Sequence, residues 1–240
     1  MLNGWVPTRL LLLADTPGRP HSLGTVRPLT FPHHDAVEAF AAQADEFLAA
    51  VASCDDLQLL GASRCHGWAL LDVLVHVRIG LQEMALGSTR RADGEPECDA
   101  ATYWSEHPDN RDDDQVPHIL WLRRTSSAYS RPSGALEHLR DAVTGAVGAV
   151  RAMPEGVIEF QGRRIRSGDF IGTWVVELAI HQLDLGLDDS PSGLAWARRT
   201  LEAVADAELP AGLEDRSAVL AGLGRAPAPT ELPPAFPVSL

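Results

Sequence analysis

The amino-acid sequence predicts an all-α protein, a four-helix bundle with a small β-hairpin and extra helices toward the carboxyl end. Four long segments repeat apolar residues at the spacing of helical turns. An acidic, proline-containing connection separates the second of these segments from the third, as in bundles that have a crossing connection. The 240 residues, 45% of them hydrophobic, are enough to bury a single core.

The predicted elements follow a simple order along the chain. Helices are expected over 36–53 and 69–86. A third helical stretch is expected from near 117; it is broken or bent around Pro132 and continues through 134–153. The segment VIEFQGRRIR predicts a hairpin that turns at Gln161 and Gly162. Further helices are expected over 169–184, 192–207 and 214–222. These elements divide the chain into an irregular extension (1–32), a helical bundle (33–225) and a Pro- and Ala-rich tail (226–240).

Composition limits the classes of function. A formal net charge of −13 argues against nucleic acid and anionic membrane surfaces as partners, because both are themselves negative. The apolar run at 10–14 is far shorter than the ~20 residues that a membrane span needs, and also short for a signal peptide. The three cysteines, at positions 54, 65 and 98, are too few and too scattered for a disulfide framework. We therefore expect a cytoplasmic protein.

The helix expected over 169–184 contains the strongest chemical signal. Between the aspartates at its two ends, its only formally charged residue is Glu177, which shares one helical face with His181, Phe170 and Trp174. A carboxylate among apolar neighbours costs several kcal/mol unless a positive group meets it. No Lys or Arg lies within helical reach, whereas a metal ion would satisfy the carboxylate and the imidazole together. The segment therefore predicts a metal site.

Spacing alone does not establish that site. An acid four residues before a histidine occurs three times, at Asp72/His76, Asp114/His118 and Glu177/His181. Such a pair is more often an ordinary side-chain hydrogen bond than a pair of ligands. The middle pair lies in a proline-containing loop and is interpreted as a coincidence. The apolar setting distinguishes Glu177/His181.

A third ligand can come from the helix expected over 69–86. His76 lies in a strongly apolar run, in a narrow polar line with Asp72 and Glu83. This line either faces water or faces the middle of a bundle, where side chains from facing helices commonly build metal sites. Two histidines and one carboxylate suit zinc with an open position, and non-haem iron uses the same ligand types.

Two of these segments resemble signatures of the DinB-like, mycothiol-dependent maleylpyruvate isomerase N-terminal domain family. GWALLDVLVHV is similar to the family's Gly-Trp helix with its Asp and His, and VVELAIHQLDLG is similar to its second signature, with Glu, His and Asp. YWSEHPD, from Tyr103, and FQGRRIRSGDF agree in order and spacing, so the resemblance covers roughly residues 33–225.

The resemblance implies a DinB-like four-helix bundle and a ligand set. His76, Glu177 and His181 would hold a divalent metal ion, with water or a thiolate in the fourth position. Asp184 completes the second signature, and we interpret it as second-shell or structural, as we do Asp72 and Trp68. The family also implies mycothiol, or a similar low-molecular-weight thiol, as a cosubstrate.

The sequence departs from the family pattern at several places. His66 stands where the family often has Pro, and Gln182 stands where it often has Arg. The characterised isomerases add a carboxyl-terminal domain that helps to bind the substrate, whereas only about fifteen residues follow Arg225 here. We therefore expect the metal site to carry over, but not maleylpyruvate as the substrate.

Other polar residues leave two interpretations open. Cys65 is either a nucleophile or, as we favour, a small buried residue at the start of a helix. Arg123 and Arg124 can bind the carboxylate of a thiol cofactor or an acidic substrate, or they can be solvated surface residues. The same two interpretations apply to the arginines of the hairpin, Arg163, Arg164 and Arg166.

These observations predict a metal-dependent thiol enzyme, a transferase or isomerase acting on a small electrophile. Coordination by a divalent ion deprotonates a thiol near neutral pH, so no cysteine of the chain is required. One alternative is a metal- or small-molecule-binding protein without turnover, and consumption of thiol with an electrophile would distinguish it. The other is a metal-dependent hydrolase, which would work without thiol.

Overall fold

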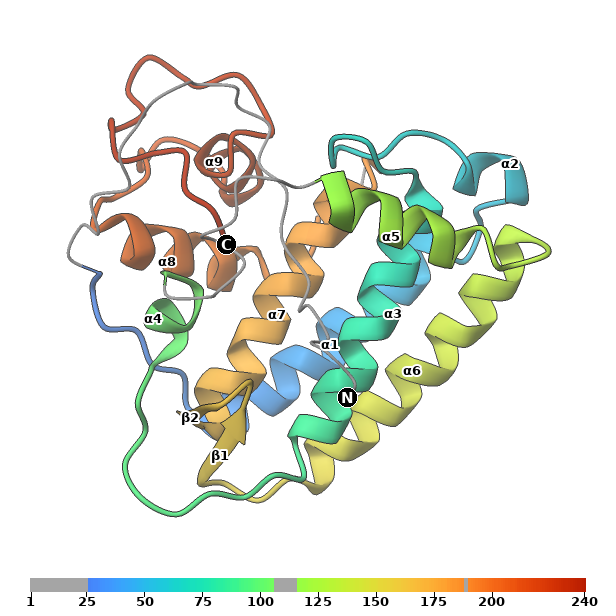
Figure 1. Cartoon of the computed structure of the whole chain (residues 1–240). Coiled ribbons are helices and arrows are strands. Elements are labelled where there is room, and N and C mark those ends of the chain that lie inside the picture. Colours follow the sequence, from blue (N-terminus) through green and yellow to red (C-terminus); the bar gives the residue numbers. More distant parts are fainter. Residues whose placement is uncertain (1–25, 106–115, 188–189) are drawn as a thin grey trace.

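Four long helices form a bundle that confirms the predicted all-α class (Figure 1). The computed structural model describes residues 26–105, 116–187 and 190–240. The bundle helices are α1 (His33–Val51), α3 (Leu70–Gly87), α6 (Pro132–Ala152) and α7 (Ser167–Asp184). Helix α1 packs against α7 and α6, while α3 packs against α6 and faces α7.

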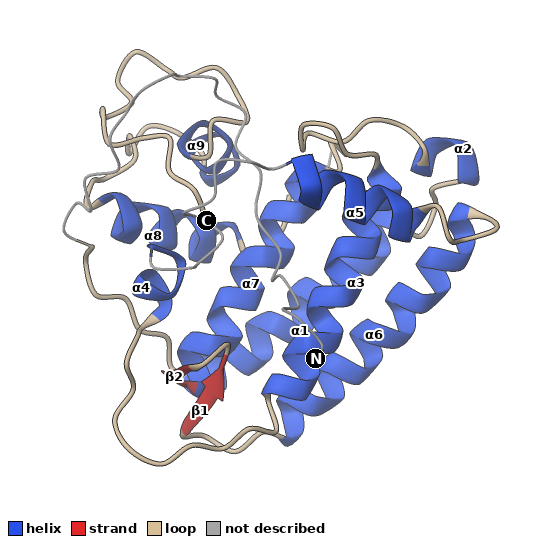
Figure 2. Ribbon diagram, in the orientation of Figure 1, coloured by secondary structure: helices blue, strands red, loops and turns tan. Residues whose placement is uncertain are grey.

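Smaller elements surround the bundle, as Figure 2 shows. They are the helices α2 (Asp56–Leu59), α4 (Ala100–Ser105), α5 (Val116–Ser126), α8 (Leu194–Ala205) and α9 (Asp215–Gly222), and the strands β1 (Val157–Phe160) and β2 (Arg163–Arg166). Every predicted helix is present, with ends within three residues of those expected. Of the two alternatives predicted around Pro132, a break or a bend, the structure shows a break, because α5 ends at Ser126 and Pro132 starts α6.

Two short helices were not predicted, and local side chains explain both. Asp55 and Gln58 form a reciprocal capping box around the start of α2, with both hydrogen bonds at 2.8 Å. The Asp99 carboxylate accepts hydrogen bonds from two backbone N–H groups at the start of α4, both at 2.9 Å. Neither helix is long enough to show a periodic apolar pattern.

The predicted hairpin is confirmed, and its turn lies where expected. Strands β1 and β2 are antiparallel, with Val157 opposite Arg166 and Phe160 opposite Arg163. The two turn residues, Gln161 and Gly162, have φ values of 50° and 78°. Two successive positive φ values are typical of the type I′ turn, whose twist matches that of the strands. Gln161 is therefore in a conformation that costs energy for a residue with a Cβ.

Helix α7 is the centre of the molecule, since all of its residues are buried. Two glycines in its first turns allow residues 26–32, which form no helix or strand, to lie directly against it. A Cβ at Gly168 would lie 2.1 Å from the Phe31 carbonyl oxygen, and one at Gly172 would lie 2.4 Å from the Phe31 ring. Phe236 and Leu240, from the Pro- and Ala-rich segment, are also buried in the core.

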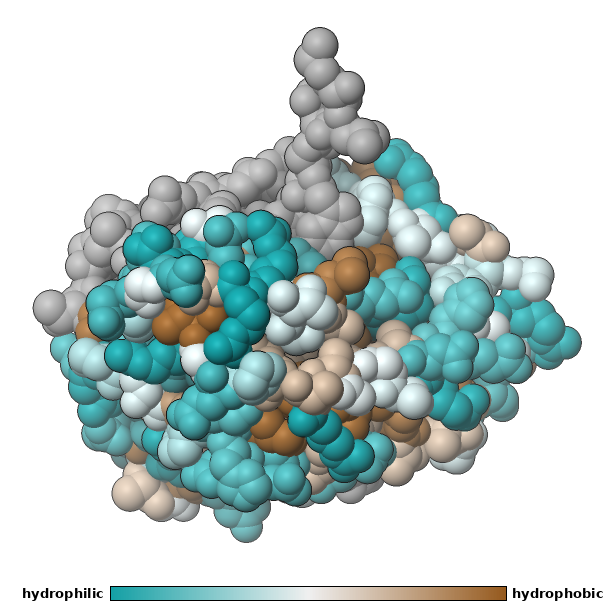
Figure 3. Space-filling view, turned by 90° about the horizontal axis from the view of Figure 1, so that it is seen from below, coloured by the Kyte–Doolittle hydropathy of each residue, from teal (hydrophilic) through white to brown (hydrophobic). Residues whose placement is uncertain are grey.

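The described helices include none that is long and apolar enough to cross a membrane. The apolar residues of helix α7 are buried against neighbouring elements of the fold. Figure 3 shows one face of the molecule, on which hydrophilic residues cover most of the surface and hydrophobic ones form small separate areas.

Asp169 links residues 26–32 to the first turn of α7 by a hydrogen bond. Its Oδ1 accepts a hydrogen bond from the Phe31 backbone N–H at 2.7 Å, while its Oδ2 is buried without a hydrogen-bond partner among the described residues. Burial raises the pKa of this carboxyl to about 6, assisted by the nearby Asp99 and opposed by the Phe31 hydrogen bond and by Arg166.

This raised pKa predicts a pH-dependent stability. Because the folded protein binds the Asp169 proton more tightly than the unfolded chain, the contribution of this group is greatest below about pH 4 and is lost as the pH rises to about 6. In urea unfolding measured across this range, we expect Asp169→Asn to remove a decline on the order of 1–2 kcal/mol. Identical pH profiles for the two proteins would contradict the assignment.

Candidate metal centre

The three predicted ligands meet between α3 and α7. His76 Nε2 lies 3.0 Å from Glu177 Oε1, and His181 Nε2 lies 3.3 Å from the same oxygen. One ligand atom from each residue lies within 4.8 Å of the others, and all three residues are buried. Of the two interpretations of His76, the water-facing one is wrong, because only 2% of the residue is exposed.

The charges of this cluster depend on one another. Burial alone would raise the pKa of Glu177, but His181 and His76 outweigh it and lower that pKa to about 2. Burial also opposes the charge of His181, yet Glu177 and Asp184 hold its pKa well above the ordinary value. Burial, with repulsion from His181, lowers the pKa of His76 to about 4. The proton of His181 is thus the positive charge that Glu177 requires.

A buried ion pair holds His181 from behind. His181 Nδ1 lies 3.1 Å from Asp184 Oδ2, and Arg225 contacts both oxygens of Asp184, at 2.5 Å from Nε to Oδ1 and 3.2 Å from Nη2 to Oδ2. A hydrogen on Nδ1 therefore donates to Asp184, which leaves Nε2 facing Glu177. Asp184 therefore supports His181 by holding its other ring nitrogen, as expected from the sequence. The part that Arg225 plays was not predicted from the sequence.

Cys65 lies in a second group that shares His181. Its ligand atom lies within 4.8 Å of those of His181 and Asp184, and the residue is 2% exposed. Burial raises the pKa of the Cys65 thiol, and the charge of Asp184 raises it further. Because Arg225 already engages both oxygens of Asp184, this second group suits a metal ion less well than the first.

Trp68 and Asp72 have different places around the candidate ligands. The Trp68 ring is buried against both histidines, with ring centroids 5.0 Å from His76 and 6.3 Å from His181. Asp72 instead accepts a hydrogen bond from the Ala69 N–H at 2.9 Å, which stabilises the first turn of α3.

His118 is a residue that the sequence reasoning set aside. It lies in the first turn of α5, and its ring centroid lies 5.9 Å from that of Trp68. Its charge contributes to the lowered pKa of His76, although burial and His181 contribute more. Asp114, the acid of this spacing pattern, lies outside the described residues.

The arginines proposed as anion ligands are not part of the cluster. Arg123 and Arg124 are both exposed on α5, and only Arg123 lines a second pocket, which it shares with Arg64, Cys65 and Trp68. In the hairpin, Arg164 forms an ion pair with Glu97 at 2.9 Å. Anion binding by Arg123 and Arg124 stays a prediction.

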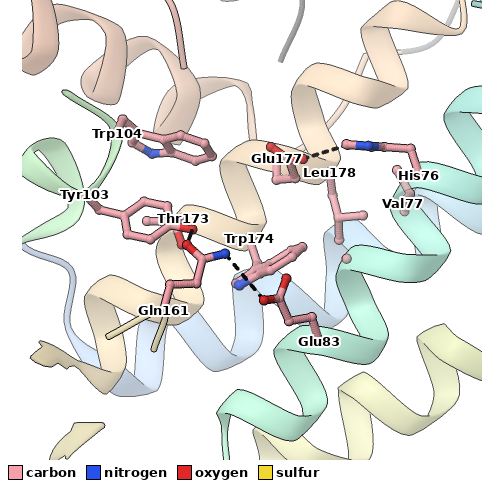
Figure 4. Close-up of a pocket in the computed structure, with 11 residues that line it drawn as sticks. His76, Val77, Glu83, Tyr103, Trp104, Gln161, Thr173, Trp174, Glu177 and Leu178 are labelled. Atoms are coloured by element: carbon pink, nitrogen blue, oxygen red, sulfur yellow. Dashed lines mark hydrogen bonds and ion pairs between the residues drawn. The ribbon is translucent and has the colours of Figure 1, made fainter. Parts of the chain in front are cut away.

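A pocket opens onto two of the candidate ligands, His76 and Glu177, as Figure 4 shows. His76 and Glu177 form one end of it, between α3 and α7. Side chains from α3, α4, α7 and the hairpin turn complete its walls: Val77, Gly80, Glu83, Tyr103, Trp104, Gln161, Thr173, Trp174 and Leu178. A small molecule bound here would contact His76 and Glu177.

Known proteins share both the sequence pattern and the fold. The family model for the mycothiol maleylpyruvate isomerase N-terminal domain matches residues 40–186, which include all three candidate ligands. Two solved structures have a similar fold: a mycothiol-dependent maleylpyruvate isomerase, with TM-score 0.53 and 16% identity, and a histidine-to-alanine mutant of such an isomerase, with TM-score 0.52 and 14% identity. Each alignment covers 74% of this chain and 72% of the other. No curated protein matches the sequence.

The Arg225–Asp184 pair predicts a large effect on stability. Both side chains are at most 1% exposed, so Arg225→Ala leaves a buried carboxylate without its cation. We expect the free energy of unfolding, measured in urea by circular dichroism, to fall by about 3–5 kcal/mol. The control is Arg90→Ala, which removes an ion pair to Glu159 whose side chains are 59% and 46% exposed. This control should cost less than about 1 kcal/mol, and an equal effect of the two changes would refute the role of Arg225.

Proposed function

We propose a function from the premise that the chain belongs to the mycothiol maleylpyruvate isomerase N-terminal domain family, whose model matches more than half of its residues. The proposed function is a metal-dependent enzyme in which a low-molecular-weight thiol, such as mycothiol, attacks a small electrophile. The observation that carries this proposal is the convergence of His76 Nε2 and His181 Nε2 on Glu177 Oε1, together with a pocket that His76 and Glu177 line.

The proposed ligand set fits a divalent ion on three grounds. Two imidazoles and a carboxylate are ligands that zinc accepts, and non-haem iron uses the same types. The Nε2 of His181 is buried, and its ion-pair contact with Glu177 Oε1, at 3.3 Å, does not have the geometry of a hydrogen bond. The carboxylate of Asp184 holds the other ring nitrogen, as outer-shell carboxylates do for metal-binding histidines. A bound ion would replace the His181 proton as the positive partner of Glu177.

The proposed nucleophile is an external thiol. When bound, the ion would supply a charge that lowers the pKa of a thiol to near neutrality. Two of the chain's three thiols are poorly suited, because burial and a neighbouring aspartate raise the pKa of both Cys65 and Cys54. The thiolate sulfur adds to one carbon of an activated double bond, whose π electrons move to the neighbouring carbon. In conjugation that carbon takes up the proton that the thiol lost, and the carbon–sulfur bond persists. In isomerisation the electron pair instead re-forms the double bond after rotation, the carbon–sulfur bond breaks, and the thiolate is released.

Two other functions use the same residues and are separated by assay. A hydrolase would activate water in place of the thiol, and a binding protein would hold metal or a small molecule without turnover. The family's description favours the thiol enzyme, because it names mycothiol.

The ligand set predicts which variants lose metal. We expect His76→Ala to lose most of its zinc by elemental analysis while its helical content, measured by circular dichroism, is unchanged. Cys65→Ser is the matched control, because Cys65 belongs to the alternative group with His181 and Asp184. If His76→Ala keeps stoichiometric zinc and Cys65→Ser loses it, the alternative group is the metal site.

The mechanism predicts that turnover depends on added thiol. In an assay that follows the loss of free mycothiol with a generic electrophile, replacing Cys54, Cys65 and Cys98 together by Ala should leave most of the activity. Glu177→Gln should abolish it, because a neutral amide is a poor ligand and does not offset the charge of the ion.

Three outcomes would replace this mechanism. Equal activity without thiol would indicate a hydrolase, and no turnover by zinc-loaded wild type would indicate a binding protein. Loss of activity in a folded triple-cysteine variant would place the nucleophile within the chain.

A further inference from the structure

The second pocket lies between α5 and the loop that joins α2 to α3 (Figure 1). Its cavity volume is about 430 Å³, which is within the range of small-molecule sites. Residues 60 and 62–69 form most of its wall, and Arg123 of α5 completes it. Among the described residues, the two pockets share no lining residue. The second pocket is therefore a separate cavity that the proposed function does not use.

The wall of the second pocket is basic. It contains Arg64, His66 and Arg123, and the described residues contribute no carboxylate to it. The chain as a whole has a formal net charge of −13, so this wall differs in sign from the rest of the molecule. A cavity lined by charges of one sign concentrates ligands of the opposite sign. The second pocket therefore favours an anion.

Several hydrogen-bond donors on this wall are not used by the fold. The side chains of His66 and Arg123 are exposed and have no partner among the described residues. Arg64 donates from Nε to the Leu183 carbonyl at 3.1 Å, which leaves its two Nη groups without a partner among the described residues. Trp68 is 3% exposed, and its Nε1 is buried without a hydrogen-bond partner in the described part of the chain. Unpaired buried donors are rare, so this one indicates a missing acceptor.

The loop that carries these donors is held in shape by its own hydrogen bonds. The backbone N–H and the Oγ of Ser63 both donate to the Trp68 carbonyl at 3.0 Å. The Arg64 backbone N–H donates to the Asp184 carbonyl at 2.7 Å, which ties the loop to the end of α7. Gly67 has a φ of 79°, which a glycine adopts without strain. A ligand would therefore enter a formed pocket and would not have to order the loop.

Apolar side chains form another part of the same wall. Leu60 lines the pocket although 57% of it is exposed, and Ala62 and Ala69 lie on the same loop. A ligand with an apolar body would cover Leu60, and removing apolar surface from water favours binding. The pocket thus combines guanidinium groups with an uncovered apolar side chain.

We infer that the second pocket binds a small oxyanion, a carboxylate or a phosphate, that is attached to an apolar body. Guanidinium groups bind such oxyanions through pairs of N–H groups, and Arg64 and Arg123 both offer them. The apolar body lies against Leu60. A cation would be repelled by the two arginines. This inference goes beyond the proposed function and does not depend on it, because none of the three proposed metal ligands lines the pocket.

The first experiment tests the charge of the ligand by NMR titration with benzoate and with benzamide, its uncharged counterpart. Wild type should bind benzoate about tenfold more tightly, the effect of charge-assisted hydrogen bonds. Arg123→Gln should remove most of this preference. Arg124→Gln is the matched control, because it removes the same charge from the next residue of α5, which does not line the pocket. An equal loss in both variants, or no preference in wild type, would overturn the inference.

The second experiment tests the apolar body by comparing benzoate with acetate. Wild type should bind benzoate roughly tenfold more tightly, because its ring covers apolar surface. Leu60→Ser should reduce the affinity for benzoate by roughly two- to fivefold and leave that for acetate unchanged. Leu57→Ser is the control, since Leu57 is 79% exposed on α2 and does not line the pocket. Equal affinities of wild type for benzoate and acetate would contradict an apolar body.

A third probe, phenyl phosphate, distinguishes the two oxyanions. Binding that is tighter than that of benzoate and that Arg123→Gln weakens would assign the pocket to a phosphate, and the reverse order would assign it to a carboxylate. All titrations are made with and without zinc, and zinc should leave the affinities unchanged. Binding that appears only with zinc would place the anion on the metal, which would overturn this inference and support the proposed metal centre. Unchanged benzoate binding by a protein that takes up no zinc would contradict the metal centre alone.

Discussion

The burial of the Glu177 carboxylate inside a fully buried helix is the constraint on which this structure depends. Its negative charge is met by His181 one turn away and by His76 on the facing helix. His181 is met in turn by Asp184, and Asp184 by Arg225, so charges of opposite sign alternate along a buried row. Removing one member leaves a neighbour as an unpaired buried charge, which is why these residues must be placed together.

The pocket beside this row lies between α3 and α7. On α3, His76 and Glu83 are separated by seven residues, or about 10 Å along the helix, with Gly80 between them. The Trp174 ring of α7 lies against Gly80, so the two helices are separated by an aromatic ring at that level. One end of the pocket therefore has the ligand atoms and the other the hydrogen-bonding groups.

The sequence predicted the features that depend on local pattern. Helical periodicity identified the bundle, and the pair Gln161-Gly162 identified the turn. The apolar surroundings of Glu177 identified the cluster, because a lone acid in such a segment needs a partner. The Arg225–Asp184 contact could not be predicted, since it joins residues 41 positions apart and leaves no periodic trace. For the same reason, the turn was found but not the pocket into which Gln161 extends.

The position of Cys65 explains why the family's use of an external thiol suits this chain. Cys65 lines the second pocket and is not among the residues that line the first, although it groups with His181. Its thiol lies beside Asp184, whose negative charge disfavours a thiolate. Burial is the larger cause of the raised pKa of this thiol and Asp184 adds to it, while His181 and Arg225 oppose them. Under the proposed function, a thiol entering the first pocket would meet His76 and Glu177 instead, where a bound cation would favour its ionisation.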